Sequence, residues 1–505
     1  MSVKKLVGTI ARKLGSNKGA PRVWLEGILP ERAGFKAGAR YNVQVSEGEA
    51  RVVLRLDNDG IRLVSAKTKA DRTLPVIDIN SKELLARFEG MDAVRVVLME
   101  GELHILPDAV EVKKRERKQR LEKAIEDGLI TVASVSHGMG VLSNALHKGF
   151  EDAGLKSRLL WACEIDEEYI GQAAYANNAW DNDTIAVAMP MQKLAFADDY
   201  TLKHLQSPVV LEGGLPCTAA SPAGRSKKHL ARAEDDEEAG HLVAAFIAII
   251  ARVNPSAVLL ENVKAYMNTS GYAILRTQLK ELGYVVHERD VEGEDYAIEA
   301  RPRRVMVAVT EGVDLDLSRM VAPRREPQTI GMILESVPED DPSWSEMAYL
   351  DAKEERDKAA GKGFRQQIVG PDDTSVGVCG RGYGKRRATE PRLRHPSNPK
   401  LKRLFTPIEH ARLKGVPEEM LKGVNSHTRA HELLGQSVIW PAFRHLGEFL
   451  GRSLTGTLNN VAQPIVSTAV EWVQPAQSVV SSAKQEAVEP STGSLFETLP
   501  LFEAA

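Results

Sequence analysis

Short apolar runs alternate with amphipathic stretches of helical length between about residues 130 and 310. The first run, 130–135, precedes a glycine-bearing turn and a helical pattern over 141–153. A second apolar run follows at 159–163. Strands that alternate with helices in this way are typical of a parallel sheet covered by helices. The pattern therefore predicts an α/β domain of Rossmann-like type over residues 129–310.

The chain before this domain has a different pattern. Residues 1–107 hold strand-like pieces between turn signals, which predicts a β-rich N-terminal module. Residues 31–38 faintly resemble a segment of AbrB-like swapped-hairpin barrels; a purely structural add-on is the commoner alternative. Residues 108–128 are dense in charge and predict a solvated helical linker.

Composition limits the classes of protein that remain. The chain has 505 residues, 43% of them hydrophobic, and a net charge of −3, so any surface for nucleic acid must arise from local segregation of charge. No apolar run approaches the ~18 residues that span a bilayer, and the basic N-terminus lacks the pattern of a signal peptide. Three cysteines without paired spacing fit a reducing cytoplasm and argue against a disulfide or zinc framework.

The strongest chemical signal lies at the ends of two successive predicted strands. Residues 208–211 are apolar, Gly213 and Gly214 allow a sharp turn, and Cys217 follows. The next strand ends on Glu261. Because parallel strands end at the same edge of a sheet, we expect Cys217 and Glu261 to share a pocket. A cysteine beside loop amides can act as a nucleophile, although a small buried thiol is the plainer alternative.

These residues also carry a family resemblance. Pro216, Cys217 and Ser221 match a Pro-Cys-x-x-x-Ser motif, and residues 261–263 read Glu-Asn-Val. In this order and spacing they resemble the DNA cytosine-5 methyltransferases. The resemblance implies that Cys217 attacks C6 of the base and that Glu261 stabilises charge on the ring.

The same resemblance implies S-adenosylmethionine as cofactor. The glycine turn after the first strand and the acid after the second match places that hold this cofactor. The implied cofactor-binding residues are Gly138, Met139, Gly140, Glu164, Ile165, Pro216, Ser437 and Val438. Three departures from the family motifs fall in this site. Ser136 stands where the family usually has Phe, Val141 stands where it has Gly, and no acid follows the third strand near Met189.

An arginine motif of the family, Gln-x-Arg-x-Arg, has an imperfect match near residue 300. An ungapped alignment puts Arg304 on the second arginine and Pro302 on the first, and the Gln is missing. A shift by one residue would use Arg301 and Arg303 instead. We take Arg304 as the third catalytic residue, assisting at O2 of the base.

Residues 311–400 lose the α/β rhythm, and the resemblance implies a target-recognition region here. Residues 379–403 hold nine Lys or Arg against one acid, Glu390, although a solvated basic loop is the alternative. The predicted DNA-binding residues are Ser221, Arg225, Arg381, Lys385, Arg386 and Arg387.

Residues 401–454 match the last motifs of the family and predict the C-terminal part of the methyltransferase domain. Thr406 and Glu409 form a capping-box pattern at a helix start. Residues 455–505 predict a disordered tail. Within it, Leu499, Leu501 and Phe502 resemble a short peptide that docks on the bacterial replication sliding clamp; a chance match is the commoner alternative.

Together these features predict a DNA (cytosine-5) methyltransferase that acts on a flipped-out base of double-stranded DNA. We expect a cytoplasmic, nucleoid-associated enzyme of bacterial, phage or plasmid type, as in restriction-modification systems. Two alternatives stay open: a methyltransferase of the same chemistry acting on RNA such as tRNA, and a DNA-binding relative with weakened catalysis.

Overall fold

The computed structural model describes residues 4–46, 50–69, 72–216, 220, 228 and 230–456. Among the predicted site residues, Cys217, Ser221 and Arg225 lie outside this range. The predicted tail, with its clamp-like residues Leu499, Leu501 and Phe502, lies outside it from residue 457 onward.

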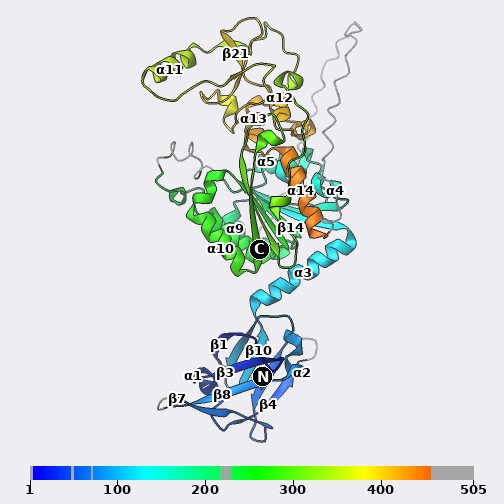
Figure 1. Cartoon of the computed structure of the whole chain (residues 1–505), viewed down its shortest axis with the longest axis vertical. Coiled ribbons are helices and arrows are strands. Elements are labelled where there is room, and N and C mark those ends of the chain that lie inside the picture. The colour runs from blue at the N-terminus through cyan, green and yellow to red at the C-terminus, as the bar shows by residue number, and fades with distance from the viewer. Residues whose placement is uncertain are drawn as a thin grey trace, which may run out of the picture. The chain divides into compact units, whose positions relative to one another are not determined.

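The N-terminal residues form two antiparallel sheets that share one hydrophobic core. The strands are β1 (Leu6–Lys13), β2 (Gly15–Asn17), β3 (Ala20–Glu26), β4 (Arg40–Val45), β5 (Val52–Leu56), β6 (Arg62–Leu63), β7 (Ser65–Lys69), β8 (Arg72–Asn80), β9 (Ala93–Met99) and β10 (Glu102–Pro107). Their orders are β1-β9-β10-β5-β4-β6 and β2-β3-β8-β7, with short helices α1 (Ile28–Arg32) and α2 (Lys82–Leu85) beside them (Figure 1). Along β3, Val23 and Leu25 are buried while Trp24 is exposed, which is the alternation of a sheet with one covered face.

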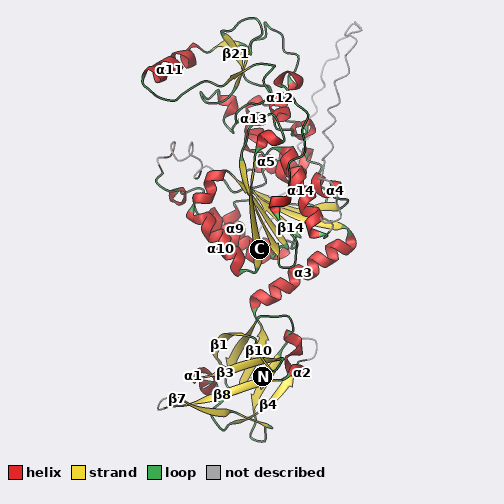
Figure 2. Cartoon of the chain, viewed as in Figure 1, coloured by secondary structure: helices red, strands yellow, loops and turns green. Residues whose placement is uncertain are grey.

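A seven-stranded sheet with the order β13-β12-β11-β14-β15-β17-β16 forms the centre of the α/β part (Figure 2). Its strands are β11 (Leu129–Val135), β12 (Lys156–Glu164), β13 (Ile185–Ala188), β14 (Val210–Gly213), β15 (Ala257–Asn262), β16 (Tyr284–Val291) and β17 (Arg303–Thr310). The five strands from β11 to β15 pair in parallel, and β17 is antiparallel to both β15 and β16. The predicted Rossmann-like α/β architecture is confirmed.

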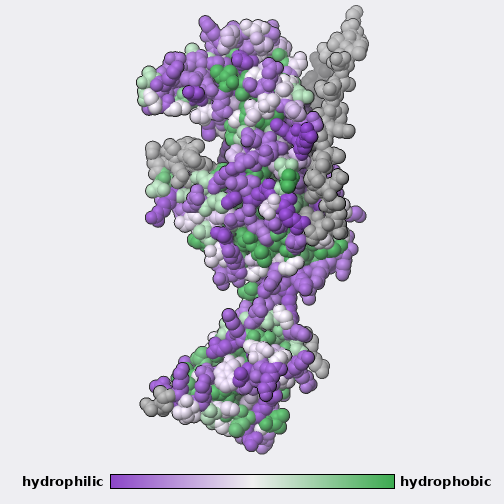
Figure 3. Space-filling view, in the orientation of Figure 1, coloured by the Kyte–Doolittle hydropathy of each residue, from purple (hydrophilic) through white to green (hydrophobic). Residues whose placement is uncertain are grey.

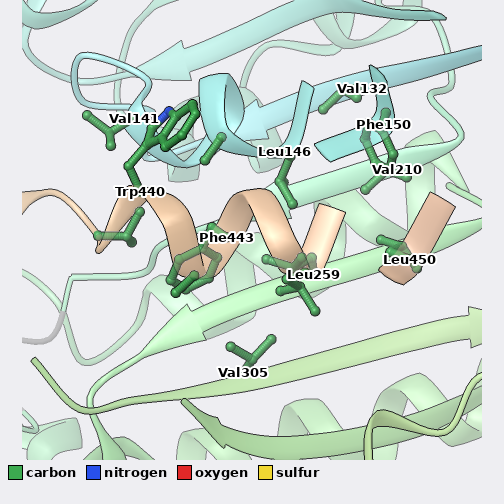
Figure 4. Packing of buried hydrophobic residues seen from close by; sticks show 14 of the residues in the cluster. Val132, Val141, Leu146, Phe150, Val210, Leu259, Val305, Trp440, Phe443 and Leu450 are labelled. Atoms are coloured by element: carbon green, nitrogen blue, oxygen red, sulfur yellow. The ribbon is translucent and has the colours of Figure 1, made fainter. Parts of the chain in front are cut away.

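Helices cover both faces of this sheet. One face packs against α4 (Val141–Asp152), α5 (Glu167–Ala176), α13 (His427–Gln436) and α14 (Trp440–Leu454). The other packs against α6 (Met191–Phe196), α7 (Asp199–His204), α9 (Leu242–Val253) and α10 (Ser270–Glu281). Figure 4 shows Trp440, Phe443 and Leu450 of α14 in the first of these cores, with Val210 of β14 and Leu259 of β15.

Helices α4 and α14 approach so closely that only glycine fits at their contact. A Cβ atom added at Gly149 would lie 2.1 Å from the backbone oxygen of Arg444, and one at Gly447 would lie 2.7 Å from that of Leu146. This close approach joins the C-terminal helix α14 to the helix that follows the first strand.

We therefore expect Gly149→Ala to lower the free energy of unfolding by ~1–3 kcal/mol, the usual cost of overpacking. The matched control is Gly171→Ala, at an exposed position of α5 where an added Cβ meets nothing within 4 Å. That change should stabilise the protein by up to ~1 kcal/mol through helix propensity. Thermal unfolding of both variants measures the difference, and equal midpoints would contradict the close contact.

The charged segment before β11 forms helix α3 (Ala109–Asp127), as predicted, but one side of it is not solvated. Arg117 is fully buried, stacks over the ring of Tyr284 at 4.0 Å, and donates to Asn254 Oδ1 at 3.1 Å and to the carbonyl of Leu282 at 2.9 Å. The predicted solvated helical linker is thus partly buried on this side, because a single arginine in a charge run can be fully satisfied by buried acceptors.

The region after β17 carries a small sheet with the order β18-β21-β20-β19. Its strands are β18 (Ser345–Glu346), β19 (Ile368–Val369), β20 (Arg392–Arg394) and β21 (Leu401–Arg403), with helix α11 (Ala348–Ala359) beside them. Strand β21 lies beyond the boundary predicted at residue 400. Helix α12 (Pro407–Leu413) then begins at Thr406, whose hydroxyl accepts from the backbone N–H of Glu409, while the Glu409 side chain accepts from the backbone N–H of Thr406.

No helix among the described residues is both long and apolar enough to cross a membrane. The face of the protein in Figure 3 is mainly hydrophilic, with hydrophobic residues in scattered patches.

Candidate active site

The carboxyl ends of β14 and β15 bring the two predicted catalytic segments together. In their parallel register Gly213 pairs with Leu260, so Glu261 comes directly beyond this pair. A Cβ atom added at Gly214 would lie 3.5 Å from Glu261 Oε2. Asn262 Nδ2 donates to the backbone oxygen of Leu215 at 2.9 Å and fixes the start of the loop that leads to Cys217.

Pro216 is described, but the predicted nucleophile, one residue further on, lies outside the described residues. The structure thus places the approach to Cys217 beside Glu261. That the thiol itself shares the pocket stays a prediction.

The arginine beside Glu261 is Arg303. Its Nε atom lies 2.5 Å from Glu261 Oε1, and both side chains are largely buried. Arg304, the arginine chosen from the sequence, instead pairs with Asp290 Oδ1 of β16 at 2.9 Å. Side chains alternate along β17, so Arg303 shares a face with Val305 and Glu261, whereas Arg304 points to the opposite face.

The structure therefore does not bring Arg304 to Glu261. The residue that does meet Glu261 belongs to the alignment shifted by one position. The other arginine of that shifted alignment, Arg301, is buried and donates to Glu299 Oε1 at 3.2 Å and to the Gly435 carbonyl at 2.9 Å.

The turn between β11 and α4 has the backbone conformation that its glycines permit. Gly138 and Gly140 have φ angles of +60° and +77°, where a side chain is strained. A Cβ at Gly140 would lie 2.4 Å from the side chains of Asn177 and His137, whereas the position above Gly138 is open space. The loop can therefore receive a ligand over Gly138.

Glu164, at the end of β12, closes this loop. Its Oε2 accepts from the backbone N–H of Gly138 at 2.8 Å, and its Oε1 accepts from those of Ile165 and Asp166 at 2.8 and 3.1 Å. An ionised carboxylate has about four acceptor positions, so one is left for a further donor such as a ribose hydroxyl. The neighbouring Ile165 is 68% exposed and offers an apolar surface next to it.

These residues fit S-adenosylmethionine: open space over Gly138, a carboxylate with spare acceptor capacity, and an apolar platform. Met139 and Val438 are buried in the core, so only their backbone atoms could contact a ligand. The Ser437 hydroxyl donates to the backbone oxygen of Leu434 at 2.7 Å. As the sequence already showed, no acidic residue follows the third strand near Met189.

One buried polar group in this site was not foreseen. Glu212 of β14 is 2% exposed, and burial raises its pKa to about 8. His137 Nδ1 lies 4.0 Å from Glu212 Oε1, and burial lowers the pKa of His137 to about 3. The signal available in the sequence was a single glutamate inside an otherwise apolar strand.

The basic segment 379–403 separates into two groups. Six of its nine cations are exposed: Arg381, Lys385, Arg386, Arg387, Arg394 and Lys400. The other three, Arg392, Lys402 and Arg403, are buried. Arg403 forms a two-pronged ion pair with Glu409 at 2.6 and 2.7 Å, and Lys402 pairs with Asp351 at 2.5 Å. All four cations predicted to bind DNA from this segment are exposed, whereas the three buried ones hold the region together.

A second cluster has residue types that can bind a metal. Glu299, Cys379 and His410 are all buried, and one ligand atom from each lies within 4.8 Å of the others. However, Lys414 Nζ already donates to Glu299 Oε1 at 2.8 Å, and Arg301 donates to the same oxygen. A divalent ion would add charge beside two buried cations, which is costly. We interpret the cluster as a set of polar contacts that joins the segment just before β17 to the region after it.

Comparison with known proteins gives three findings. The family profile for the C-5 cytosine-specific DNA methylase matches residues 140–452. The solved structure of the Entamoeba histolytica methyltransferase EhMeth is similar with a TM-score of 0.51 and 17% identity, covering 64% of this chain and 98% of that one. The S. pombe Dnmt2 methyltransferase has a TM-score of 0.49 and 18% identity, covering 65% and 99%.

A search of curated protein sequences gives no match. The family profile nevertheless covers more than half of the chain, from the glycine loop to α14, and the Entamoeba structure shares its fold. This chain belongs to the C-5 cytosine-specific DNA methylase family, whose methyl donor is S-adenosylmethionine.

Proposed function

We propose that this protein methylates C5 of cytosine in double-stranded DNA. The observation that supports the proposal is the meeting of Gly214, three residues before Cys217, with Glu261 and Arg303 at the end of the sheet that also carries the open glycine loop. Bound S-adenosylmethionine would supply the methyl group from its sulfonium.

Each protein group has a task in this chemistry. C5 of cytosine is a weak nucleophile until the aromaticity of the ring is broken, which addition of the Cys217 thiolate to C6 achieves. Glu261 holds N3 and the exocyclic amine and stabilises the charge that develops on the ring. Loss of the C5 proton then breaks the Cys217–C6 bond and releases the product base.

We assign to Arg303, rather than Arg304, the task of orienting Glu261 and assisting at O2 of the base. Its Nε is bound to Glu261 Oε1, and its Nη1 donates to the Pro302 carbonyl at 2.8 Å. These two bonds fix the guanidinium, and with it the carboxylate, before the base arrives.

Arg303→Met should therefore lower kcat on the order of 10²-fold, the cost of a misplaced catalytic group. Arg304→Met removes only a partly exposed ion pair with Asp290 and should leave kcat close to that of the wild type. Steady-state methylation assays of both variants decide between them. A large loss in Arg304→Met with little effect in Arg303→Met would reverse the assignment.

The exposed cations of the 379–403 segment support a nucleic-acid substrate. A base inside a stacked duplex cannot reach the pocket, so the target must be flipped out while the backbone is held. We propose that Arg381, Lys385, Arg386 and Arg387 contact phosphates or base edges, together with Ser221 and Arg225 outside the described residues.

Changing those four exposed cations to Gln should weaken DNA binding and reduce the salt slope by about 0.9 for each phosphate that is no longer neutralised. The charge-matched control changes four exposed cations elsewhere to Gln, namely Lys118, Lys123, Lys148 and Lys203. Binding at several salt concentrations separates the two variants. Equal salt slopes for the two variants would show that this segment does not contact the DNA backbone.

Transfer of tritiated methyl groups to duplex DNA and to tRNA tests the substrate class. Label in DNA that bisulfite sequencing places on C5 of cytosine is the expected result. Label in tRNA alone would show that the substrate is RNA and not DNA. Binding without transfer to either would favour a relative with weakened catalysis.

A further proposal rests on the sequence alone, since Leu499, Leu501 and Phe502 lie outside the described residues. A peptide of residues 490–505 should bind a bacterial sliding clamp with a Kd no tighter than about micromolar. The same peptide with Leu501 and Phe502 changed to Ala is the control. Equal signals from both peptides would discard the idea.

A further inference from the structure

Glu212 lies between the glycine loop and the catalytic carboxylate. Strand β14 is the neighbour of both β11 and β15, and Glu212 pairs in register with Ser134 on one side and Leu259 on the other. Because side chains alternate, Ser134, Glu212 and Glu261 all belong to the face that packs against α4 and α14. Glu212 therefore lies on the strand between the one that leads into the glycine loop and the one that ends on Glu261.

Hydrogen bonds fix how this carboxyl is oriented. The indole N–H of Trp180 can only donate, and it donates to His137 Nε2 at 3.1 Å. His137 is therefore neutral with its proton on Nδ1, which lies 2.7 Å from Ser134 Oγ and donates to it. The Ser134 hydroxyl then donates to Glu212, with which it forms a hydrogen bond. This series of hydrogen bonds runs in one direction, from Trp180 to an oxygen of Glu212.

Nothing cationic compensates a charge on this carboxyl within the described part of the chain. No lysine or arginine there forms an ion pair with Glu212, and the two titratable groups that face it are the neutral His137 and the acid Glu261. Glu261 is itself paired with Arg303. Burial accordingly raises the pKa of Glu212 to about 8, so the group carries a proton at neutral pH.

The inference rests on the proposed function, in which the methyl donor brings a positively charged sulfonium between the glycine loop and Glu261. The sulfonium of the methyl donor must lie within reach of C5, and the base must lie between Cys217 and Glu261. We propose that Glu212 is the counter-ion of that sulfonium: it is protonated in the free protein and releases its proton to solvent when S-adenosylmethionine binds. The demethylated product, S-adenosylhomocysteine, has a neutral sulfur, so Glu212 takes up a proton again from solvent. This counter-ion would make the site bind S-adenosylmethionine in preference to S-adenosylhomocysteine.

The test measures binding of S-adenosylmethionine and S-adenosylhomocysteine to the full-length protein by calorimetry, in buffers of different ionisation enthalpy, between pH 6 and 8. The two ligands differ in the sulfonium but share the amino and carboxyl groups. For S-adenosylmethionine we expect release of about one proton at pH 7 and affinity that rises up to about tenfold per pH unit, because binding is coupled to one ionisation below its free pKa. For S-adenosylhomocysteine we expect neither.

Glu212→Gln keeps the size of the side chain and an acceptor for Ser134. In this variant the proton release and the pH dependence for S-adenosylmethionine should disappear, while S-adenosylhomocysteine should bind as to the wild type, which also shows that the site is folded. Equal proton release for the two ligands in the wild type would overturn the proposal, whatever the variant does. So would S-adenosylmethionine binding that is independent of pH, or proton release that survives in Glu212→Gln. None of these outcomes depends on whether the nucleic acid is DNA or RNA.

Discussion

Changing Cys217 to serine should abolish methyl transfer while DNA binding survives. A hydroxyl is not ionised at neutral pH and cannot replace a thiolate in the attack on C6. We expect a loss on the order of 10⁴- to 10⁶-fold, the scale seen when a covalent nucleophile is removed. Methylation assays and DNA-binding titrations on the same preparation measure both quantities.

A trapping experiment tests the covalent step directly. Duplex DNA with 5-fluorocytosine at the target should form a stable adduct with the wild-type protein and S-adenosylmethionine, because fluorine cannot leave as a proton does. Cys217→Ser supplies the control without adduct. An active wild-type enzyme that forms no adduct would contradict nucleophilic attack by Cys217.

Changing Glu261 to Gln should lower kcat on the order of 10²- to 10⁴-fold, the range for losing a general acid or a charge-stabilising group. The amide keeps the size of the side chain but cannot form the ion pair with Arg303 that holds the carboxylate in place. Single-turnover rates at saturating DNA measure the effect on the chemical step.

Cofactor affinity provides the control for this variant. Glu261 follows β15, whereas the glycine loop follows β11, and β14 lies between them. Binding of S-adenosylmethionine should therefore barely change in Glu261→Gln. A collapse of that affinity with an unchanged kcat would mean that Glu261 serves the cofactor instead of the base.

The order of the elements could be predicted from the sequence because each depends on local patterns. The strand, glycine turn and helix expected over 130–153 correspond to β11, the open loop and α4. The capping box at Thr406 is a short-range pattern too, and both of its hydrogen bonds are present. Placing Glu261 close to Gly214, three residues before Cys217, needed only the rule that parallel strands end at one edge.

Facts that depend on side-chain direction could not be predicted in the same way. Arg303 and Arg304 are adjacent in sequence, and only the pairing of β17 with β15 and β16 shows which one faces Glu261. The cations of the 379–403 segment look alike along the chain. Which of them are buried against Glu409 and Asp351, and which remain exposed, follows from the folding of the small sheet.

Motifs and periodicity along the chain were enough to identify the family, the chemistry expected at Cys217 and Glu261, and the α/β order, since these are properties of neighbouring residues. The partner of Glu261, the burial of Arg117 and the environment of Glu212 became visible only in the folded protein. Each of these depends on groups brought together from distant strands, where burial and the direction of hydrogen bonds set the charge that a side chain carries.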